Sequence, residues 1–250
     1  MSEHISSISC VIIVKNAAST IDETLSSLKY FEDVILYDNG STDETLEIAK
    51  KYSNVNIVHG DFIGFGETKN HAASFAKNSW IFSLDADEVL PHDLIEELKT
   101  LKLDNEKEVF IIKRDNYFLD KEIKHSGWGK DFLTRIYNKN KHAFNKNMVH
   151  EFVELKNDTK KTKLKKSFKH NAVQDINQFL QKIMKYSDLA SKDKKTCCFL
   201  TVIFKAKWAF VKTYFLQMGF LDGWRGFVIA VSNFNGKFFR YTKRYINCKK

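Results

Sequence analysis

Short apolar runs alternate with segments of helical periodicity through the first hundred residues. This alternation predicts a β-α-β-α order and a parallel, doubly wound sheet. Ligands of such sheets bind beyond the carboxyl ends of the strands, so the polar residues after each run are candidates for a site. The runs are Ile8 to Val14, Val34 to Tyr37, Val55 to Val58 and Trp80 to Leu84, and the helical segments are Ser19 to Tyr30, Asp43 to Tyr52 and Thr68 to Lys77.

The pattern changes after the fourth run. Pro91, the only proline, should open a helix through Leu101, because proline is tolerated in the first helical turn. Strand-like segments follow, then a lysine-rich stretch at 156–169, and from Gln174 onward the periodicity is helical. Without an internal repeat or a Gly/Ser linker, we expect the C-terminal helices to pack on the first domain. The strand-like segments are Val109 to Lys113, Phe132 to Tyr137 and Val149 to Leu155.

The composition is that of a globular protein with a basic C-terminal end. Apolar residues make up 43% of the 250 residues and charged residues 28%, which argues against wholesale disorder. Residues 199–250 contain ten Lys or Arg and one acid, Asp222, which leaves 30 basic and 30 acidic residues in the rest. The net charge of +9 therefore lies entirely in the C-terminal segment.

The cysteines and the apolar segments bear on the compartment. Because the cysteines form no CxxC pair, we expect neither a disulfide framework nor a zinc site. The expected compartment is a reducing one. Residues 1–9 lack a basic region followed by an apolar core, so no secretory signal is expected. Three lysines interrupt the most apolar stretch, Phe199 to Phe220, which argues against a membrane-spanning helix. The four cysteines are Cys10, Cys197, Cys198 and Cys248.

Two aspartates follow the fourth run, in Leu84-Asp85-Ala86-Asp87-Glu88. If the chain is still extended there, Asp85 and Asp87 point to the same side. Two convergent carboxylates suit Mg²⁺ or Mn²⁺, and such an ion would bridge the phosphates of a nucleotide. The alternative is that Asp87 or Glu88 only caps the helix that opens at Pro91.

A third aspartate follows the second run, in Asp38-Asn39-Gly40-Ser41-Thr42-Asp43-Glu44. Asn39-Gly40 predicts a turn, and Ser41 with Glu44 would form a capping box for the next helix. The turn and the capping box give no role to Asp38. A carboxylate at a strand end can accept a hydrogen bond from a nucleobase or a sugar.

The segment Gly64-Phe65-Gly66-Glu67-Thr68-Lys69-Asn70 lies between the third run and its helix. Glycines there would let the backbone approach a ligand, and Lys69 could contact phosphate. The spacing is neither GxGxxG nor that of a P-loop, so the segment alone is a weak signal.

Together these segments resemble family 2 glycosyltransferases of the GT-A fold, over residues 8 to about 100. Within the family the likeness is greatest to bacterial lipopolysaccharide core glucosyltransferases, and it extends more loosely through Val149-His150-Glu151 and Gly219-Phe220-Leu221-Asp222-Gly223. The matching segments, in order, are Ser9-Cys10-Val11-Ile12-Ile13-Val14-Lys15-Asn16, Asp38-Asn39-Gly40-Ser41-Thr42-Asp43, Lys69-Asn70 and Asp85-Ala86-Asp87-Glu88.

The resemblance implies an α/β fold with a Rossmann-like mixed sheet, the GT-A nucleotide-diphospho-sugar transferase fold, followed by a C-terminal helical appendage. Residues 1–172 would form the catalytic domain, with a nucleotide-binding half at 1–100 and an acceptor half at 101–172. Residues 173–250 would form a basic, aromatic helical region that associates with membranes.

The resemblance also assigns roles to residues. Asp38 would bind the base, uracil, and Val14 would line the nucleotide pocket. Asp85 and Asp87 would hold the diphosphate through Mg²⁺ or Mn²⁺. His150 is a further candidate, either as a ligand of the metal or as a contact of the phosphate. The nucleotide-sugar site would comprise Val14, Asn16, Asp38, Ser41, Lys69, Asn70 and Asp85.

The catalytic base is less defined. Inverting members of the family use a carboxylate to remove the acceptor proton, and Glu151 is the first candidate, with Asp131 of Trp128-Gly129-Lys130-Asp131 as the second. The alternative is that these side chains simply face solvent. No Gly-x-Glu-Asp or Gln-x-x-Arg-Trp segment follows residue 100, so the processive polysaccharide synthases of the family are poor models.

Residues 199–250 combine their excess charge with fourteen of the 34 aromatic residues. An apolar stripe at helical spacing, flanked by lysines, is typical of a helix that lies on an anionic membrane surface. The alternative is that the stripe packs on the catalytic domain. No nucleic-acid motif accompanies these residues, so no nucleic-acid partner is expected. The stripe consists of Phe204, Trp208, Val211 and Phe215, and the lysines are Lys205, Lys207 and Lys212.

These observations favour an inverting glycosyltransferase that moves glucose from a UDP-sugar to a lipopolysaccharide core or another lipid-linked saccharide, at the cytoplasmic face of a bacterial membrane. Two other classes are compatible with the residues alone. A metal-dependent nucleotidyltransferase could use the same carboxylates, and a non-enzymatic module could bind membrane surfaces.

Overall fold

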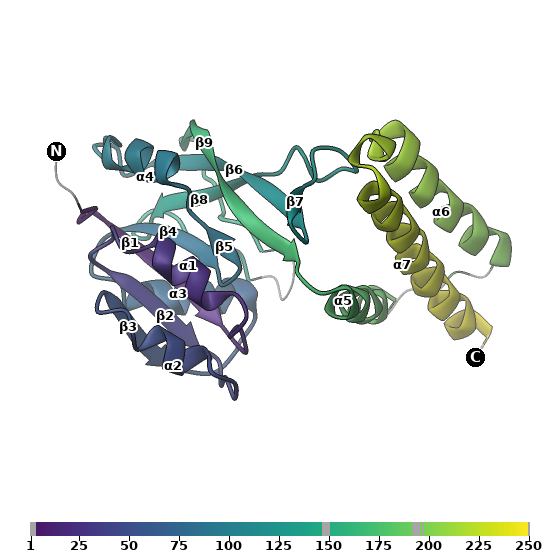
Figure 1. Ribbon diagram of the computed structural model, residues 1–250, viewed down its shortest axis with the longest axis horizontal. Coiled ribbons are helices and arrows are strands. Elements are labelled where there is room, and N and C mark those ends of the chain that lie inside the picture. The colour runs from purple at the N-terminus through teal and green to yellow at the C-terminus, as the bar shows by residue number, and fades with distance from the viewer. Residues whose placement is uncertain (1–3, 147–150, 192–195, 197, 250) are drawn as a thin grey trace. The chain divides into compact units, whose positions relative to one another are not determined.

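The structure is a computed structural model that describes residues 4–146, 151–191, 196 and 198–249. The chain forms two compact units, one of residues 1–114 and 132–170 and the other of residues 115–131 and 171–250. Segment 115–131 thus belongs to the second unit, although the sequence suggested that it is part of the acceptor half. Figure 1 shows the elements of both units.

The first four strands of the first unit are parallel. They lie in the order β3-β2-β1-β4, as the alternation of apolar runs and helices predicts. The first two helices are shorter than predicted, and the third has the predicted length but begins and ends three residues earlier. The elements are β1 (Ile8–Val14), α1 (Ile21–Ser27), β2 (Val34–Asp38), α2 (Thr45–Ala49), β3 (Val55–His59), α3 (Phe65–Ser74) and β4 (Trp80–Asp85).

Both faces of this sheet are buried. Cys10 and Ile12 of β1 pack in one apolar cluster with residues of α1, whereas Val11 packs in a second cluster with Ala72 and Ala73 of α3. Successive side chains of a strand point to opposite faces, so α1 and α3 cover opposite faces of the sheet. This explains why successive residues from Cys10 to Val14 are all apolar, and it confirms the doubly wound arrangement.

Antiparallel strands extend the sheet beyond β4 in the order β8-β6-β9-β5, which makes it mixed. β8 is antiparallel to both β4 and β6, and the short β5 is antiparallel to β9. Pro91 is the N-cap of α4 instead of lying within it. The further elements are β5 (Glu88–Val89), α4 (His92–Lys99), β6 (Glu108–Phe118), β7 (Lys121–Glu122), β8 (Phe132–Asn138) and β9 (Lys160–Val173).

The sequence prediction fails for two segments here. Within the expected strand Val149 to Leu155, the described residues make only an isolated bridge, from Val153 to Phe144. The lysine-rich stretch instead forms most of β9, a long strand that buries Leu164 and Phe168 but leaves its N-terminal lysines exposed. Its apolar residues recur every fourth position, so the alternation that identifies strands is weak there.

The second unit is helical, as the sequence predicts from Gln174 onward. α6 packs against α7, and α5 against α7 (Figure 1). No helix among the described residues is long and apolar enough to cross a membrane. Cys248 is disulfide-bonded, which the spacing of the cysteines did not indicate. The elements are α5 (Ile176–Leu189), α6 (Phe199–Val211), the π-helical turn η1 (Lys212–Leu216), the 3-10 turn η2 (Gly219–Asp222) and α7 (Trp224–Lys249).

Asp222, in the segment from Gly219 to Gly223, has a structural role. Its buried carboxylate accepts hydrogen bonds from the backbone N–H groups of Lys124 and His125, both at 3.2 Å, and from the Ser126 hydroxyl at 2.7 Å. Segment 115–131 is thereby attached to the helices of its own unit.

Candidate active site

The parallel strands present their carboxyl ends at one edge of the sheet. Val14 is paired with Asp38 in register, Asp38 with His59, and Ile13 with Asp85. Asp38 and Asp85 therefore lie on either side of β1 at the same edge, where ligands of such sheets bind. The side chain of Val14, only 3% exposed, packs in the apolar cluster of α1.

Asp38 stabilises the loop that follows β2. The carboxylate is 2% exposed, and it accepts hydrogen bonds from the backbone N–H groups of Gly40 at 3.1 Å and Ser41 at 3.0 Å. Nδ1 of His59 lies 3.4 Å from Oδ2. A carboxylate oxygen can accept more than one hydrogen bond, so a nucleobase could still share this group.

Asn16 and Ser41 connect the loops that follow β1 and β2. The backbone N–H of Asn16 donates to Oγ of Ser41 at 3.0 Å, and Oδ1 of Asn16 accepts from the backbone N–H of Thr42 at 2.8 Å. The expected capping box is wrong, because Ser41 makes this contact and Glu44, the N-cap of α2, makes no capping hydrogen bond. Asn16 has a φ of +53°, a left-handed conformation that asparagine tolerates better than most residues.

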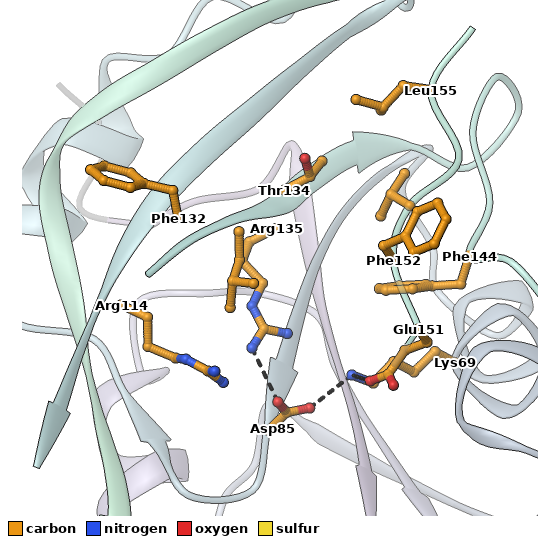
Figure 2. A pocket seen from close by; sticks show the side chains of 12 residues that line it. Lys69, Asp85, Arg114, Phe132, Thr134, Arg135, Phe144, Glu151, Phe152 and Leu155 are labelled. Atoms are coloured by element: carbon orange, nitrogen blue, oxygen red, sulfur yellow. Dashed lines mark hydrogen bonds and ion pairs between the residues drawn. The ribbon is translucent and has the colours of Figure 1, made fainter. Parts of the chain in front are cut away.

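A cavity of about 570 Å³ lies in the first unit and has Asp85 in its wall. Figure 2 shows the basic and acidic groups at one end and aromatic rings around them. This volume is within the usual range for small-molecule sites. The lining residues are Lys69, Asp85, Arg114, Phe132, Leu133, Thr134, Arg135, Phe144, Glu151, Phe152, Val153 and Leu155.

Lys69 of α3 connects two carboxylates in this cavity. Its Nζ donates to Oδ1 of Asp85 and to Oε1 of Glu151, both at 2.9 Å, and the side chain is only 3% exposed (Figure 2 shows the Asp85 contact as a dashed line). The sequence named these three residues separately, from segments up to 82 positions apart. The structure brings all three together.

Arg135 of β8 is a second buried cation that the sequence analysis did not name. Its guanidinium donates to Oδ2 of Asp85 at 3.1 Å and to the fully buried Glu88, and Arg114 lies 3.3 Å from Oε1 of Glu88. The sequence contained one indication of this role. Arg135 is the single arginine of the expected apolar strand 132–137, and a buried arginine must have acidic partners.

The buried cations fix the charge of Asp85. Burial alone would raise the pKa of Asp85, but the charges of Lys69 and Arg135, and their hydrogen bonds, hold it well below its ordinary value. Burial is also the main cause that raises the pKa of Glu88. Asp85 is therefore ionised at neutral pH, as a ligand of a metal must be.

Asn70 contacts the backbone of Phe144. Its Nδ2 donates to the Phe144 carbonyl at 2.9 Å, and its Oδ1 accepts from the Phe144 N–H at 2.8 Å. Gly66 lies beside this contact, since a Cβ there would come within 1.8 Å of the Asn145 carbonyl oxygen. The first turns of α3 thus hold the segment that leads towards Glu151.

Asp85 and Asp87 remain candidates for holding a divalent ion. β4 ends at Asp85, and Ala86 and Asp87 form a turn, so the argument from extended alternation does not apply. Asp87 lies 3.5 Å from Nε2 of His170. Two carboxylates fit Mg²⁺ or Mn²⁺ if phosphate oxygens and water complete the coordination. The described residues contain no cluster of three or more metal-ligating side chains, and His150 lies outside them.

Asp131, the second candidate base, belongs to the second unit. Its Oδ2 accepts a hydrogen bond from Nδ2 of Asn116 at 3.1 Å. Only Glu151 of the two candidates is thus brought together with Asp85 and Lys69 in the first unit's cavity.

The mixed sheet, with candidate acids at its parallel strand ends and a helical unit after it, has the architecture of a GT-A glycosyltransferase. The model of the family described as "Glycosyl transferase family 2" matches residues 9–167, and the chain belongs to that family. It is therefore a glycosyltransferase, and the nucleotidyltransferase and the non-enzymatic module are set aside.

Relatives of the chain include proteins named as glycosyltransferases. The chain is 28% identical to an uncharacterized glycosyltransferase of Rickettsia prowazekii, over 94% of this chain and 86% of the relative. It is 35% identical to the glycosyltransferase SunS of Bacillus phage SPbeta, over 32% of this chain and 20% of that protein. Among solved structures, TarS of S. aureus in complex with UDP-GlcNAc has a TM-score of 0.47 and 16% identity, with 92% of this chain and 81% of that chain covered.

Proposed function

We propose that this glycosyltransferase inverts the anomeric centre while it moves glucose from UDP-glucose to a lipid-linked saccharide, such as a lipopolysaccharide core. The observation that carries the proposal is the joining of Asp85, Lys69 and Glu151 in one cavity at the carboxyl edge of the sheet. UDP, glucose and the acceptor class follow from the family resemblance of the sequence segments.

The donor end of the cavity is cationic. Lys69, Arg114 and Arg135 line it, and their charges would stabilise the diphosphate as it departs. A divalent ion held by Asp85 and Asp87 would supply Lewis-acid stabilisation of the same charge. Asp38 would accept a hydrogen bond from the uracil, with Asn16 and Ser41 fixing the loops beside it.

Glu151 would act as the base at the acceptor end. The acceptor oxygen forms a bond to the anomeric carbon while the bond from that carbon to the diphosphate oxygen breaks, and its electron pair leaves with UDP. The acceptor proton passes to the Glu151 carboxylate, which Lys69 holds in the cavity. Asp131 is the alternative base.

Product analysis tests the function. Purified protein incubated with UDP-glucose, Mn²⁺ and a lipid-linked core saccharide should release UDP and form the β-linked product. A panel of other nucleotide sugars serves as the control, and the proposed donor should also raise the apparent stability in a thermal-shift assay with Mn²⁺. Release of no UDP from UDP-glucose, with release from another donor, would overturn the assignment of the sugar.

We further propose that the second unit binds the cytoplasmic face of the membrane peripherally. Phe204, Trp208, Val211 and Phe215 are 65%, 49%, 38% and 55% exposed, and Lys205, Lys207 and Lys212 beside them are exposed as well. Large apolar side chains exposed together on one helix face often mark an interaction site. Aromatic side chains would enter the acyl boundary while the lysines contact anionic headgroups.

Introducing negative charge into the stripe should weaken this binding. The full-length double variant Phe204→Glu/Phe215→Glu should sediment with phosphatidylglycerol vesicles at least about tenfold more weakly, because each aromatic side chain contributes about 1.5 to 3 kcal/mol when buried. The control is Ile63→Glu, at a side chain of the first unit that is 51% exposed. Equal sedimentation of wild type and double variant would contradict membrane binding through the stripe.

A further inference from the structure

The second unit contains a cavity of its own, of about 490 Å³. It lies between α6, η1 and α7 on one side and the loop at 126–128 on the other, and all its lining residues belong to this unit. The cavity is large enough for a monosaccharide with a charged substituent. Its lining residues are Ser126, Gly127, Trp128, Lys205, Trp208, Ala209, Lys212, Thr213, Gln217, Asn233, Lys237 and Tyr241.

Three lysines contribute the only formal charges of this lining. Lys205, Lys212 and Lys237 come from α6, η1 and α7, and the residues of the lining that the structure describes include no carboxylate. Within the part of the chain that the structure describes, none of the three ammonium groups forms an ion pair with an acid. Asp222, the only acid of residues 199–250, already accepts hydrogen bonds from the loop at 124–126.

The positive charge is concentrated enough to affect its own members. The pKa of Lys237 is lowered, first by its partial burial and then by the surrounding cations. A bound anion would relieve this repulsion, which is a reason for the cavity to attract one. The cations that lower this pKa are Arg240, Arg244, Lys212 and Lys205.

The other lining residues suit a sugar. Trp128, Trp208 and Tyr241 provide aromatic rings, on which the C–H face of a pyranose can pack. Gln217 and Asn233 provide amides that can exchange hydrogen bonds with hydroxyl groups. An isolated phosphate would use the lysines but would leave the rings and amides without a role.

We propose that this cavity binds a phosphate-bearing sugar, with the lysines on the phosphate and the aromatic rings on the sugar. This binding site lies in the second unit and goes beyond the proposed function. The binding itself requires no turnover and can be tested separately.

Tryptophan fluorescence of the full chain, titrated with glucose 6-phosphate, provides the test, since Trp128 and Trp208 line the cavity. Glucose 6-phosphate should bind at least about tenfold more tightly than glucose or inorganic phosphate. The Lys212→Ala/Lys237→Ala variant should lose at least about tenfold in affinity, and the control Lys182→Ala/Lys185→Ala, at two exposed lysines of α5 outside the lining, should lose none. Trp208→Phe, which preserves an aromatic ring, should reduce the fluorescence change.

Two results would overturn the proposal. The first is binding of inorganic phosphate as strong as that of glucose 6-phosphate, since the site would then recognise phosphate alone. The second is unchanged affinity in the double lysine variant with an unchanged melting temperature. Asp85→Asn should bind glucose 6-phosphate like the wild type, which separates this site from the first unit's cavity. Absent transfer with intact binding would count against the proposed function only.

Discussion

Asp85→Asn is expected to lower the rate of glycosyl transfer by about 10²- to 10³-fold, the range for removing one group that stabilises charge in a transition state. The carboxylate lies at the end of β4, between Lys69 and Arg135. In the proposed function it binds the metal and, through the metal, stabilises the diphosphate. The measurement is the initial rate of UDP release at saturating UDP-glucose, over a range of Mn²⁺ concentrations. Higher Mn²⁺ should restore part of the rate.

The control separates this loss from misfolding. Asp104→Asn changes an exposed acid of the same unit and should retain the wild-type rate. Asp85→Asn also leaves two buried cations with less compensation, so its melting temperature is recorded beside the rate. Full activity in a folded Asp85→Asn protein, or in the Asp85→Asn/Asp87→Asn protein, would refute the role of this site in diphosphate departure.

Glu151→Gln is expected to lower turnover by about 10²- to 10⁴-fold, the contribution typical of a general base. Glutamine retains an oxygen that can accept the hydrogen bond from Lys69, but it cannot take the acceptor proton. The KM for UDP-glucose should therefore stay close to that of the wild type while kcat falls. Steady-state kinetics with acceptor in excess provide both constants.

Two variants complete the experiment on the base. Glu154→Gln, three positions further on at an exposed side chain, should be indistinguishable from the wild type. Asp131→Asn examines the alternative carboxylate of the second unit. Near-normal turnover in Glu151→Gln, together with a large loss in Asp131→Asn, would transfer the role of base to Asp131.

The strands were the most predictable part of the fold. β1 to β4 were recognised to within one residue, because each is a short, mainly apolar run, and β1, β2 and β4 are buried on both faces. The same reasoning located Asp38 and Asp85 at the ends of their strands. Whether they are ligands of nucleotide and metal remains a prediction.

Other features depend on contacts that no local pattern encodes. Asn70 was expected to bind the nucleotide sugar. In the structure, the nitrogen and the oxygen of its side-chain amide both form hydrogen bonds with the backbone of Phe144, 74 positions away. Arg135 was missed because a charged residue inside an apolar strand gives no sign of its partners. β9 was missed because its buried apolar residues recur only every fourth position among lysines, a pattern that resembles a solvated loop more than an alternating strand.

The bridge that Lys69 makes between Asp85 and Glu151 has a genetic consequence. Removing Lys69 takes from Glu151 the cation that it pairs with, and removing either acid leaves the buried Lys69 with one carboxylate instead of two. Combined replacements should therefore add little to the effect of single ones. Diverging relatives of this protein should therefore replace the residues at these three positions together. A replacement at one position alone should persist only where another of the three has already changed.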